Sequence, residues 1–280
     1  TTTTDATLSQ AQIDAVAKAS GAYTPVTFTA NFAQDGDVTI TYASSNTAMG
    51  TVAPLSENVA PATGTATGST ATAKPGYHFV NWTNSSNATT TTDATLSQAQ
   101  IDAVAKASGV YVATTFTAHF AENDPTPITY ACADGTMGTV APSSENVAPA
   151  TGAAKGSTAT AKPGYHFVNW TNNIDATTTT DTTLTGAQVD AVAKTSGAYV
   201  ATIFTAHFAE NDPVTITYES ADAATGSVTP TSENVAPATG TATGSTATAK
   251  PGYHFVNWTN SSNATTTTDA TLSQAQIDAV

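Results

Sequence analysis

Alternation of apolar and polar residues predicts several strands. In residues 38–42 the side chains of Val38, Ile40 and Tyr42 alternate with threonines, which is typical of a half-buried strand. Five segments carry this pattern or a shorter version of it: residues 26–32, 38–42, 50–52, 65–73 and 78–83. Between them, residues 56–61 and 84–92 are predicted to be loops.

One segment has the features of a helix. Ser9 is a good N-cap residue, and Gln12, three positions later, completes a capping box. Lys18 is expected in the last helical turn, where its charge suits the helix dipole. Gly21 can adopt the left-handed conformation that ends many helices. The apolar stripe of this helix is narrow, which suits a helix that lies across a sheet.

These elements recur at a fixed interval of 88 residues. The segment Ala73–Thr83 returns letter for letter as residues 161–171 and 249–259, and the three copies contain all the tryptophans of the chain. A fixed period of this kind is the signature of a tandem array. Because the chain begins and ends at the same phase of the repeat, we expect it to be part of a longer array.

Polar, variable segments with glycine or proline predict the repeat boundaries. The expected domains are the C-terminal part of a preceding repeat at 1–34, complete repeats at 38–122 and 126–210, and a truncated repeat at 214–280. Each complete unit is predicted to run β-β-β-β-α-β. It would form a single sheet with one packed helix, in the α+β class.

Composition excludes some classes of partner. Only 10% of the 280 residues are charged, the formal net charge is −14, and all seven basic residues are lysines. Nucleic acids and anionic membrane surfaces are bound by clustered Arg and Lys, so neither is expected as a partner. No apolar run is long enough to predict membrane insertion. The single Cys132 cannot form an internal disulfide, which fits a bacterial surface protein better than a small secreted eukaryotic domain.

Candidate catalytic groups are sparse. Each repeat carries one histidine in its aromatic strand (His78, His166 and His254), without a carboxylate, cysteine or second histidine at metal-ligand spacing. We interpret these histidines as structural. Nucleophile–base arrangements, carboxylate pairs and phosphate-binding loops are not evident, so we expect neither enzymatic activity nor a cofactor.

Two side-chain sets suggest more specific roles. Aromatic residues of the repeated strand could form a carbohydrate platform, although such residues more often belong to the core; they are Tyr77, Trp82, Tyr165, Trp170, Tyr253 and Trp258. Lys74 could form an intradomain cross-link with Asn58, with Glu57 assisting, as some surface domains do. The simpler interpretation is a solvated lysine beside a turn.

Four motifs together give a resemblance to a known family. They are Gly50-Thr51-Val52, Gly68 to Ala73, Gly76-Tyr77-His78-Phe79-Val80-Asn81-Trp82 and Thr29-Ala30-Asn31-Phe32. The chain resembles the divergent internalin B-repeat family, the small β-grasp-like repeats of bacterial surface proteins. The helical insert from Asp93 to Gly109 is longer than the short loop of the simplest members. The resemblance implies a structural or adhesive role and supplies no catalytic residue.

These observations lead to one expected function and two alternatives. The chain is expected to be the repeat region of a bacterial cell-surface or extracellular adhesin, acting as a stalk or spacer. It would be extracellular, at the cell surface or in the cell wall. Alternatively, it is a subunit of a self-assembling filament, in which residues 1–34 of one copy complete the edge of 214–280 in another. The third hypothesis is a carbohydrate-binding array. Expected partners are neighbouring repeats, copies of the same chain, and host or matrix glycans or proteins.

Overall fold

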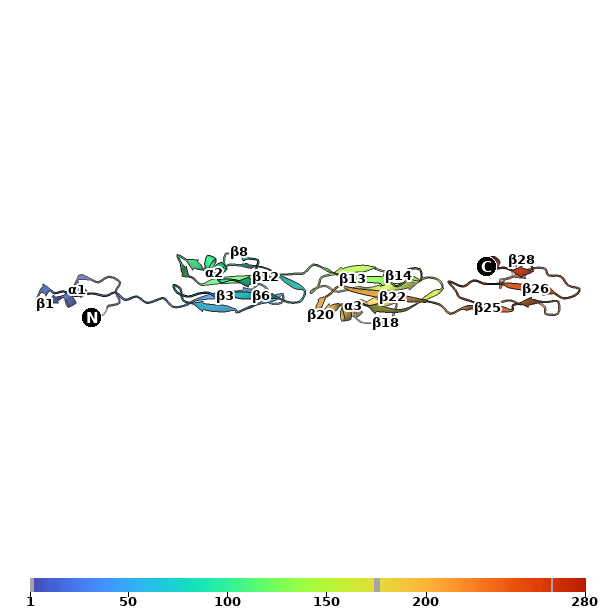
Figure 1. Cartoon of the computed structure of the whole chain (residues 1–280), viewed down its shortest axis with the longest axis horizontal. Coiled ribbons are helices and arrows are strands. Elements are labelled where there is room, and N and C mark those ends of the chain that lie inside the picture. Colours follow the sequence, from blue (N-terminus) through green and yellow to red (C-terminus); the bar gives the residue numbers. More distant parts are fainter. Residues whose placement is uncertain (1–2, 174–176, 263) are drawn as a thin grey trace. The chain divides into compact units, whose positions relative to one another are not determined.

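The computed structural model describes residues 3–173, 177–262 and 264–280 (Figure 1). The chain divides into two compact units. The first unit comprises Thr1–Ala43, Val52–Thr70 and Asn81–Ala118, and the second comprises Ser44–Thr51, Ala71–Val80 and His119–Val280. The boundary between the two units crosses the first repeat. The repeat at 126–210 lies wholly in the second unit, and we therefore describe the fold from it.

The repeat at 126–210 contains a five-stranded sheet. Its strands, in spatial order, are β15 (Ser144–Val147), β13 (Thr126–Cys132), β22 (Thr202–Glu210), β17 (Tyr165–Asn172) and β18 (Thr177–Thr179). β13 and β22 are parallel, with Tyr130 opposite Phe204, and the other pairs are antiparallel. The first and last strands of the repeat are therefore neighbours.

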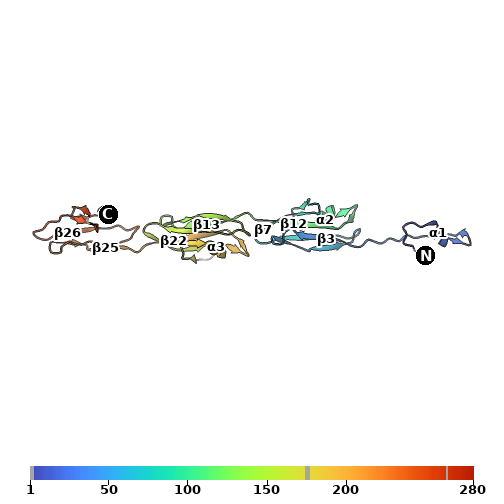
Figure 2. The same ribbon diagram turned by 180° about the vertical axis from the view of Figure 1, so that it is seen from behind.

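A second, three-stranded antiparallel sheet follows the order β14 (Gly138–Ala141), β16 (Gly156–Ala161) and β19 (Thr183–Thr185). The chain continues into helix α3 (Gly186–Ala193) and a hairpin of β20 (Lys194–Thr195) and β21 (Ala198–Tyr199). Figure 2 shows α3, β13 and β22 of this repeat from behind.

The core of this repeat combines residues from both sheets and from α3. Trp170 is completely buried, and its ring meets Tyr130 edge-on at a centroid distance of 6.3 Å. Its indole N–H donates to the carbonyl of Thr182 at 3.2 Å. The other buried members of the cluster are Ile128, Val147, Ala159, Leu184, Val189, Ala193, Tyr199, Phe204 and Ala206. Burial of these side chains is the main stabilising contribution to the repeat.

The chain before residue 126 contains the corresponding elements. Its helices are α1 (Gln10–Ala17) and α2 (Gln98–Ala105). Its strands are β1 (Lys18–Ala19), β2 (Ala22–Tyr23), β3 (Val38–Ser44), β4 (Gly50–Ala53), β5 (Ser56–Val59), β6 (Ser69–Ala73), β7 (Tyr77–Thr83), β8 (Thr89–Thr91), β9 (Thr95–Leu96), β10 (Lys106–Ala107), β11 (Val110–Tyr111) and β12 (Thr114–Glu122).

Residues 214–280 repeat part of this order. The strands are β23 (Val214–Thr217), β24 (Gly226–Thr229), β25 (Ser232–Val235), β26 (Ser245–Ala249), β27 (Trp258–Thr259), β28 (Thr265–Thr267) and β29 (Thr271–Leu272), followed by helix α4 (Gln274–Ile277). Among the described residues, no helix combines the length and the apolar character needed to cross a membrane.

The structure corrects the predicted single sheet, because each complete repeat divides its strands between sheets. Two predicted loops contain strands. Ser56–Val59 is β5, which pairs with β3 and buries Val59, and Thr89–Thr91 is β8, which pairs with β7. The β-rich character of the chain is confirmed. Residues 26–32, predicted to be a strand, have no regular secondary structure.

The helix prediction is confirmed at its start and corrected at its end. Ser9 and Gln12 form the predicted capping box. Lys18 is the C-cap and begins β1, so it does not belong to the last helical turn. Gly21 has the expected positive φ, +86°, but it lies in the turn of the β1–β2 hairpin. That hairpin, and not a free loop, follows each of the helices α1, α2 and α3.

Candidate functional site

A buried tyrosine and a glutamate form a polar centre inside each repeat. In the second repeat Glu145 accepts a hydrogen bond from the hydroxyl of Tyr130. Its carboxylate also accepts from the backbone N–H of Lys155 at 3.0 Å and of Gly156 at 3.1 Å. Burial and the neighbouring carboxylate raise the pKa of Tyr130 above its usual value. The phenol therefore stays protonated and donates.

The same centre recurs in the other repeats. Glu57 accepts from Tyr42, from the N–H and hydroxyl of Thr67, and from the N–H of Gly68. Burial alone would raise the pKa of Glu57, but these donors outweigh it and the net pKa is lowered. In the third repeat, the hydroxyl of Tyr218 and the donors of Thr243 and Gly244 lower the pKa of Glu233 to about 2.

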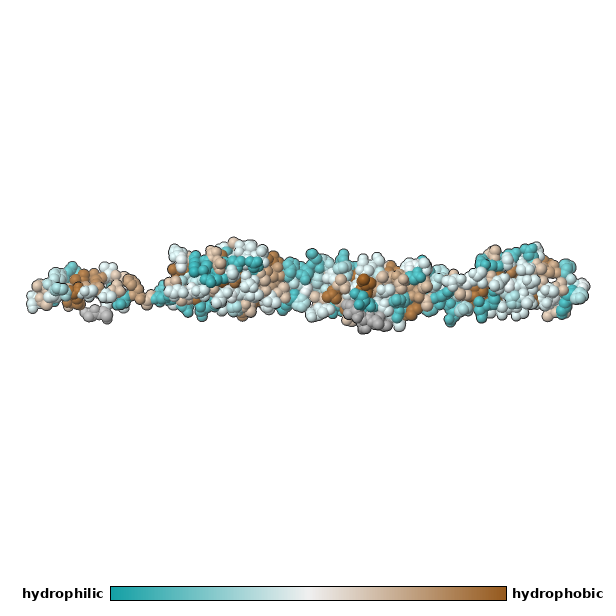
Figure 3. Space-filling model, in the orientation of Figure 1, coloured by the Kyte–Doolittle hydropathy of each residue, from teal (hydrophilic) through white to brown (hydrophobic). Residues whose placement is uncertain are grey.

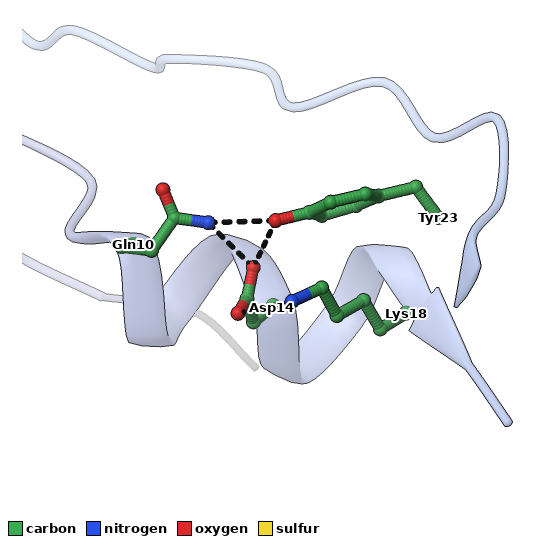
Figure 4. A network of polar contacts seen from close by, with 4 residues as sticks. All are labelled: Gln10, Asp14, Lys18 and Tyr23. Atoms are coloured by element: carbon green, nitrogen blue, oxygen red, sulfur yellow. Dashed lines mark hydrogen bonds and ion pairs between the residues drawn. The ribbon is translucent and has the colours of Figure 1, made fainter. Parts of the chain in front are cut away.

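A second polar cluster joins each of the helices α1, α2 and α3 to the hairpin that follows it, and Figure 4 shows the cluster of α1. Asp14 accepts from Gln10 Nε2 at 2.6 Å, from Lys18 Nζ at 2.7 Å and from the Tyr23 hydroxyl at 2.6 Å. The Lys18 ammonium also lies 4.6 Å from the centre of the Tyr23 ring. Hydrogen bonds from Lys18 and Tyr23 lower the pKa of Asp14 to about 2. Matching clusters are Asp102 with Lys106 and Tyr111, and Asp190 with Lys194 and Tyr199.

Three of the histidines have polar side-chain partners. His78 Nδ1 lies 3.0 Å from Asn123 Oδ1, and His166 makes the same contact with Asn211 at 2.9 Å. His207 Nε2 lies 2.9 Å from Thr171 Oγ1. Within the described residues, no group of three or more His, Cys, Asp or Glu side chains could hold a metal ion.

The structure places the indole rings of the predicted carbohydrate platform in the core. Trp82 and Trp170 are completely buried, and Trp258 is 7% exposed. The tyrosines of the repeated segment differ from one repeat to another, since Tyr77 and Tyr165 lie on strands and are half-buried, whereas Tyr253 lies outside a strand and is exposed. A buried indole offers no face to a sugar ring, so these positions argue against a stacking platform.

The predicted cross-link residues have other partners. Glu57 binds Tyr42 and the 67–68 segment, and Asn58 Oδ1 accepts from the hydroxyl of Thr39 at 2.9 Å. The Lys74 side chain is exposed. In the second repeat, the equivalent Lys162 Nζ donates to the carbonyl of Gly135 at 2.7 Å. The cross-link stays a prediction, and none of these contacts favours it.

Glu122 and Glu210 are the polar residues that sequence reasoning missed. Each stands at the end of the last strand of one repeat, and its carboxylate binds a turn of the following repeat, at Ala150 and Thr151 or at Ala238 and Thr239. Donors from Thr151 and Thr239 lower the pKa of Glu122 and of Glu210 respectively. The available signal was the 88-residue spacing of these glutamates just before the predicted linkers.

The third repeat contains a cavity of about 520 Å³. Val228 and Phe255 are among the residues that line it. In the second repeat the equivalent residues, Val140 and Phe167, pack with Phe208 of β22 in the core. Phe167 and Phe208 meet edge-on, with ring centroids 5.8 Å apart. The cavity therefore has the lining that receives a phenylalanine of a last strand.

Comparison with protein families identifies the repeat. The family model described as the divergent InlB B-repeat domain matches residues 38–124, 128–212 and 214–279. Repeats of this kind occur in bacterial surface proteins. No curated protein and no solved structure matches the chain. Because the matched regions cover most of its length in tandem, the chain belongs to the divergent InlB B-repeat domain family.

Proposed function

We propose that the chain is a structural repeat region of a bacterial cell-surface or extracellular adhesin, and that it acts as a stalk or spacer. The observation that carries this proposal is the direct bonding of the last strand of one repeat to a turn of the next, through Glu122 and again through Glu210. In tandem arrays, stability is the sum of the stability of each unit and of the contacts between neighbours.

The disposition of polar side chains supports a structural rather than a catalytic role. The carboxylates of Glu145 and Asp190, which could act as acids or bases, are each engaged by tyrosine and by further donors of the same repeat. On the face shown in Figure 3, white and teal residues cover most of the surface and brown ones are scattered, which suits an exposed spacer. We propose that the chain has no enzymatic activity.

We also propose that each repeat is β-grasp-like. The parallel pairing of the first and last strands, β13 and β22, supports this description. The helix α3 contributes Val189 and Ala193 to the core below the strands.

A length series tests the spacer proposal. Small-angle X-ray scattering would compare this chain with a version carrying two more 88-residue repeats. A spacer predicts that the maximum dimension grows by about 30 Å for each added repeat, the size of a compact unit of this length. A maximum dimension that does not grow would contradict the proposal. Labelling of intact source cells with an antibody against the repeat tests the surface location separately.

The cavity of the third repeat favours a second candidate function, assembly of copies into a filament. Residues 26–34 have the sequence pattern of β12 and β22 but no regular structure, and Phe32 is 94% exposed. A copy of this segment could enter the cavity as an added strand. Sedimentation velocity over a concentration series tests this proposal. Assembly that disappears in Phe28→Ser/Phe32→Ser but persists in Val80→Ser supports strand exchange, and a monomer at every concentration contradicts it.

A further inference from the structure

Both carboxylate oxygens of Glu122 accept hydrogen bonds from the following repeat. Glu122 Oε1 accepts from the backbone N–H of Ala150 at 2.7 Å and of Thr151 at 2.8 Å, and Oε2 accepts from the Thr151 hydroxyl at 2.8 Å. Glu210 repeats this arrangement with Ala238 and Thr239, at 2.7, 2.8 and 2.7 Å. Both carboxylate oxygens are thus used in each case.

The receiving turn has the chemistry of an anion site. In the turn at 149–151, the Gly152 N–H bonds back to the Ala148 carbonyl at 3.0 Å. The two preceding N–H groups, of Ala150 and Thr151, point out of the turn toward the carboxylate. Successive N–H groups of this kind form a concave site for an anion, and hydrogen bonds to a charged acceptor are stronger than neutral ones. The threonine hydroxyl supplies a third donor.

A glycine beside the strand end that carries Glu122 leaves room for the following repeat. The N–H of Asn123 donates to the carbonyl of Gly76 at 2.9 Å. A Cβ atom placed on Gly76 would lie 2.8 Å from the Cβ atom of Ala150, which is closer than side chains approach. The matching Gly164 stands in the same relation to Ala238. The glycine therefore allows the turn to approach the strand end that carries the glutamate.

Gln34 provides an internal comparison, because it occupies the position of Glu122 one repeat earlier. Its Oε1 accepts from the Thr63 hydroxyl at 2.7 Å. In the described part of the chain, Gln34 makes this one hydrogen bond to the turn at 61–63. A neutral amide thus replaces a carboxylate that makes three such bonds at each later position.

We propose that Glu122 and Glu210 are positioning residues that fix each repeat to the next, by placing a carboxylate in the Ala-Thr turn, and that Gln34 forms a looser junction. The inference rests on the proposed spacer function, because a spacer has a defined length only if the junctions between its repeats are fixed. It assigns the turns at 61–63, 149–151 and 237–239 as receptors for the last-strand residue of a preceding repeat.

Distance distributions between spin labels test this inference in the full chain. Cys132→Ser, the residue found in the other repeats at this position, removes the native thiol. Labels at Thr72→Cys and Thr160→Cys then occupy equivalent exposed strand positions of neighbouring repeats. Glu122→Ala is expected to broaden the distribution about twofold, because relative motion is the default for small interdomain contacts. Glu122→Gln, which copies Gln34, is expected to give an intermediate width.

Two control variants show whether a broader distance distribution comes from the junction itself or from a general change in charge or stability. Asp124→Asn removes a neighbouring exposed charge, and Glu233→Gln alters the equivalent polar centre of the third repeat, away from the labelled junction; both are expected to leave the width unchanged. Equal widths for Glu122→Ala and the parent chain would overturn the proposal. Circular dichroism checks that each variant is folded.

Amide hydrogen exchange gives an independent readout of the same bonds. Gln34→Glu is expected to slow exchange at Ala62 and Thr63, and Glu122→Gln to speed it at Ala150 and Thr151. Unchanged exchange at both turns would contradict the assignment. These results are independent of where the protein resides, so a failed surface-labelling experiment and a failed junction experiment are distinguishable.

Discussion

The hydroxyl of Tyr130 donates to the carboxylate of Glu145, and the same carboxylate receives the N–H groups of Lys155 and Gly156. The tyrosine lies on β13, and the two N–H groups belong to the first residue of β16 and to the residue before it, so this one carboxylate connects the five-stranded sheet to the three-stranded sheet. Tyr42 and Glu57, and Tyr218 and Glu233, form the same pair in the other repeats.

Tyr130→Phe should destabilise the second repeat by about 1.5–3 kcal/mol, the usual range for a hydrogen bond to a charged group. The phenyl ring keeps the packing, but Glu145 loses a donor in a partly buried site. Native-state amide exchange at Lys155 and Gly156 would measure the loss. Tyr165→Phe, which changes a half-buried tyrosine of β17, is the matched control. Equal exchange rates in the two variants would show that the pair contributes nothing.

Glu233 should titrate with a midpoint near 2, because Tyr218, Thr243 and Gly244 all donate to its carboxylate. Its pKa is below the ordinary value of 4.5, so its contribution to folding is complete above pH 4.5 and is lost as pH falls toward 2. Carbon-13 NMR of the carboxyl group would give the midpoint. Tyr218→Phe should raise it, and a midpoint near 4.5 in the unchanged chain would refute the assignment.

Gly138→Ala should destabilise the second repeat by about 1–3 kcal/mol, the cost of overpacking a core. A Cβ atom at this position would lie 2.4 Å from the ring of Phe208. Gly135→Ala is the control, because a Cβ atom there meets nothing within 4 Å. Amide exchange across β14 and β22 would compare the variants. The account of this close packing is incorrect if both substitutions have the same effect.

Local rules predicted much of the fold. The alternation of Val38, Ile40 and Tyr42, the capping box of Ser9 and the positive φ of Gly21 depend on neighbouring residues, and the structure confirms each. Strand β8 could not be read in this way, because Thr89–Thr91 has no apolar alternation and becomes a strand only by pairing with β7. Strand β5 likewise depends on its distant partner β3.

The candidate site was less accessible to sequence reasoning. Glu122 stands beside a predicted linker, and its partners Ala150 and Thr151 are 28 and 29 residues away. Nothing in the local sequence says that their N–H groups face a carboxylate, since this depends on the packing of successive repeats. The aromatic strand posed the opposite difficulty. Its tyrosine and tryptophan resemble a binding face, but the alternation alone does not say which side of a strand is buried.

Trp170→Ala and Val168→Ala should separate core packing from ligand binding on strand β17. Trp170 is completely buried and its indole N–H bonds to Thr182, so truncation should cost about 3–5 kcal/mol. Val168 is 42% exposed, two residues earlier on the same strand, and its truncation should change stability by less than about 0.5 kcal/mol. Thermal unfolding followed by circular dichroism would compare them.

A glycan array probed with the unchanged chain completes the test. A side chain buried against Tyr130 cannot stack on a sugar, so we expect Trp170 to make no contribution to glycan binding. Glycan binding that is present in the unchanged chain and lost in a folded Trp170→Phe variant would contradict the buried position of the indole.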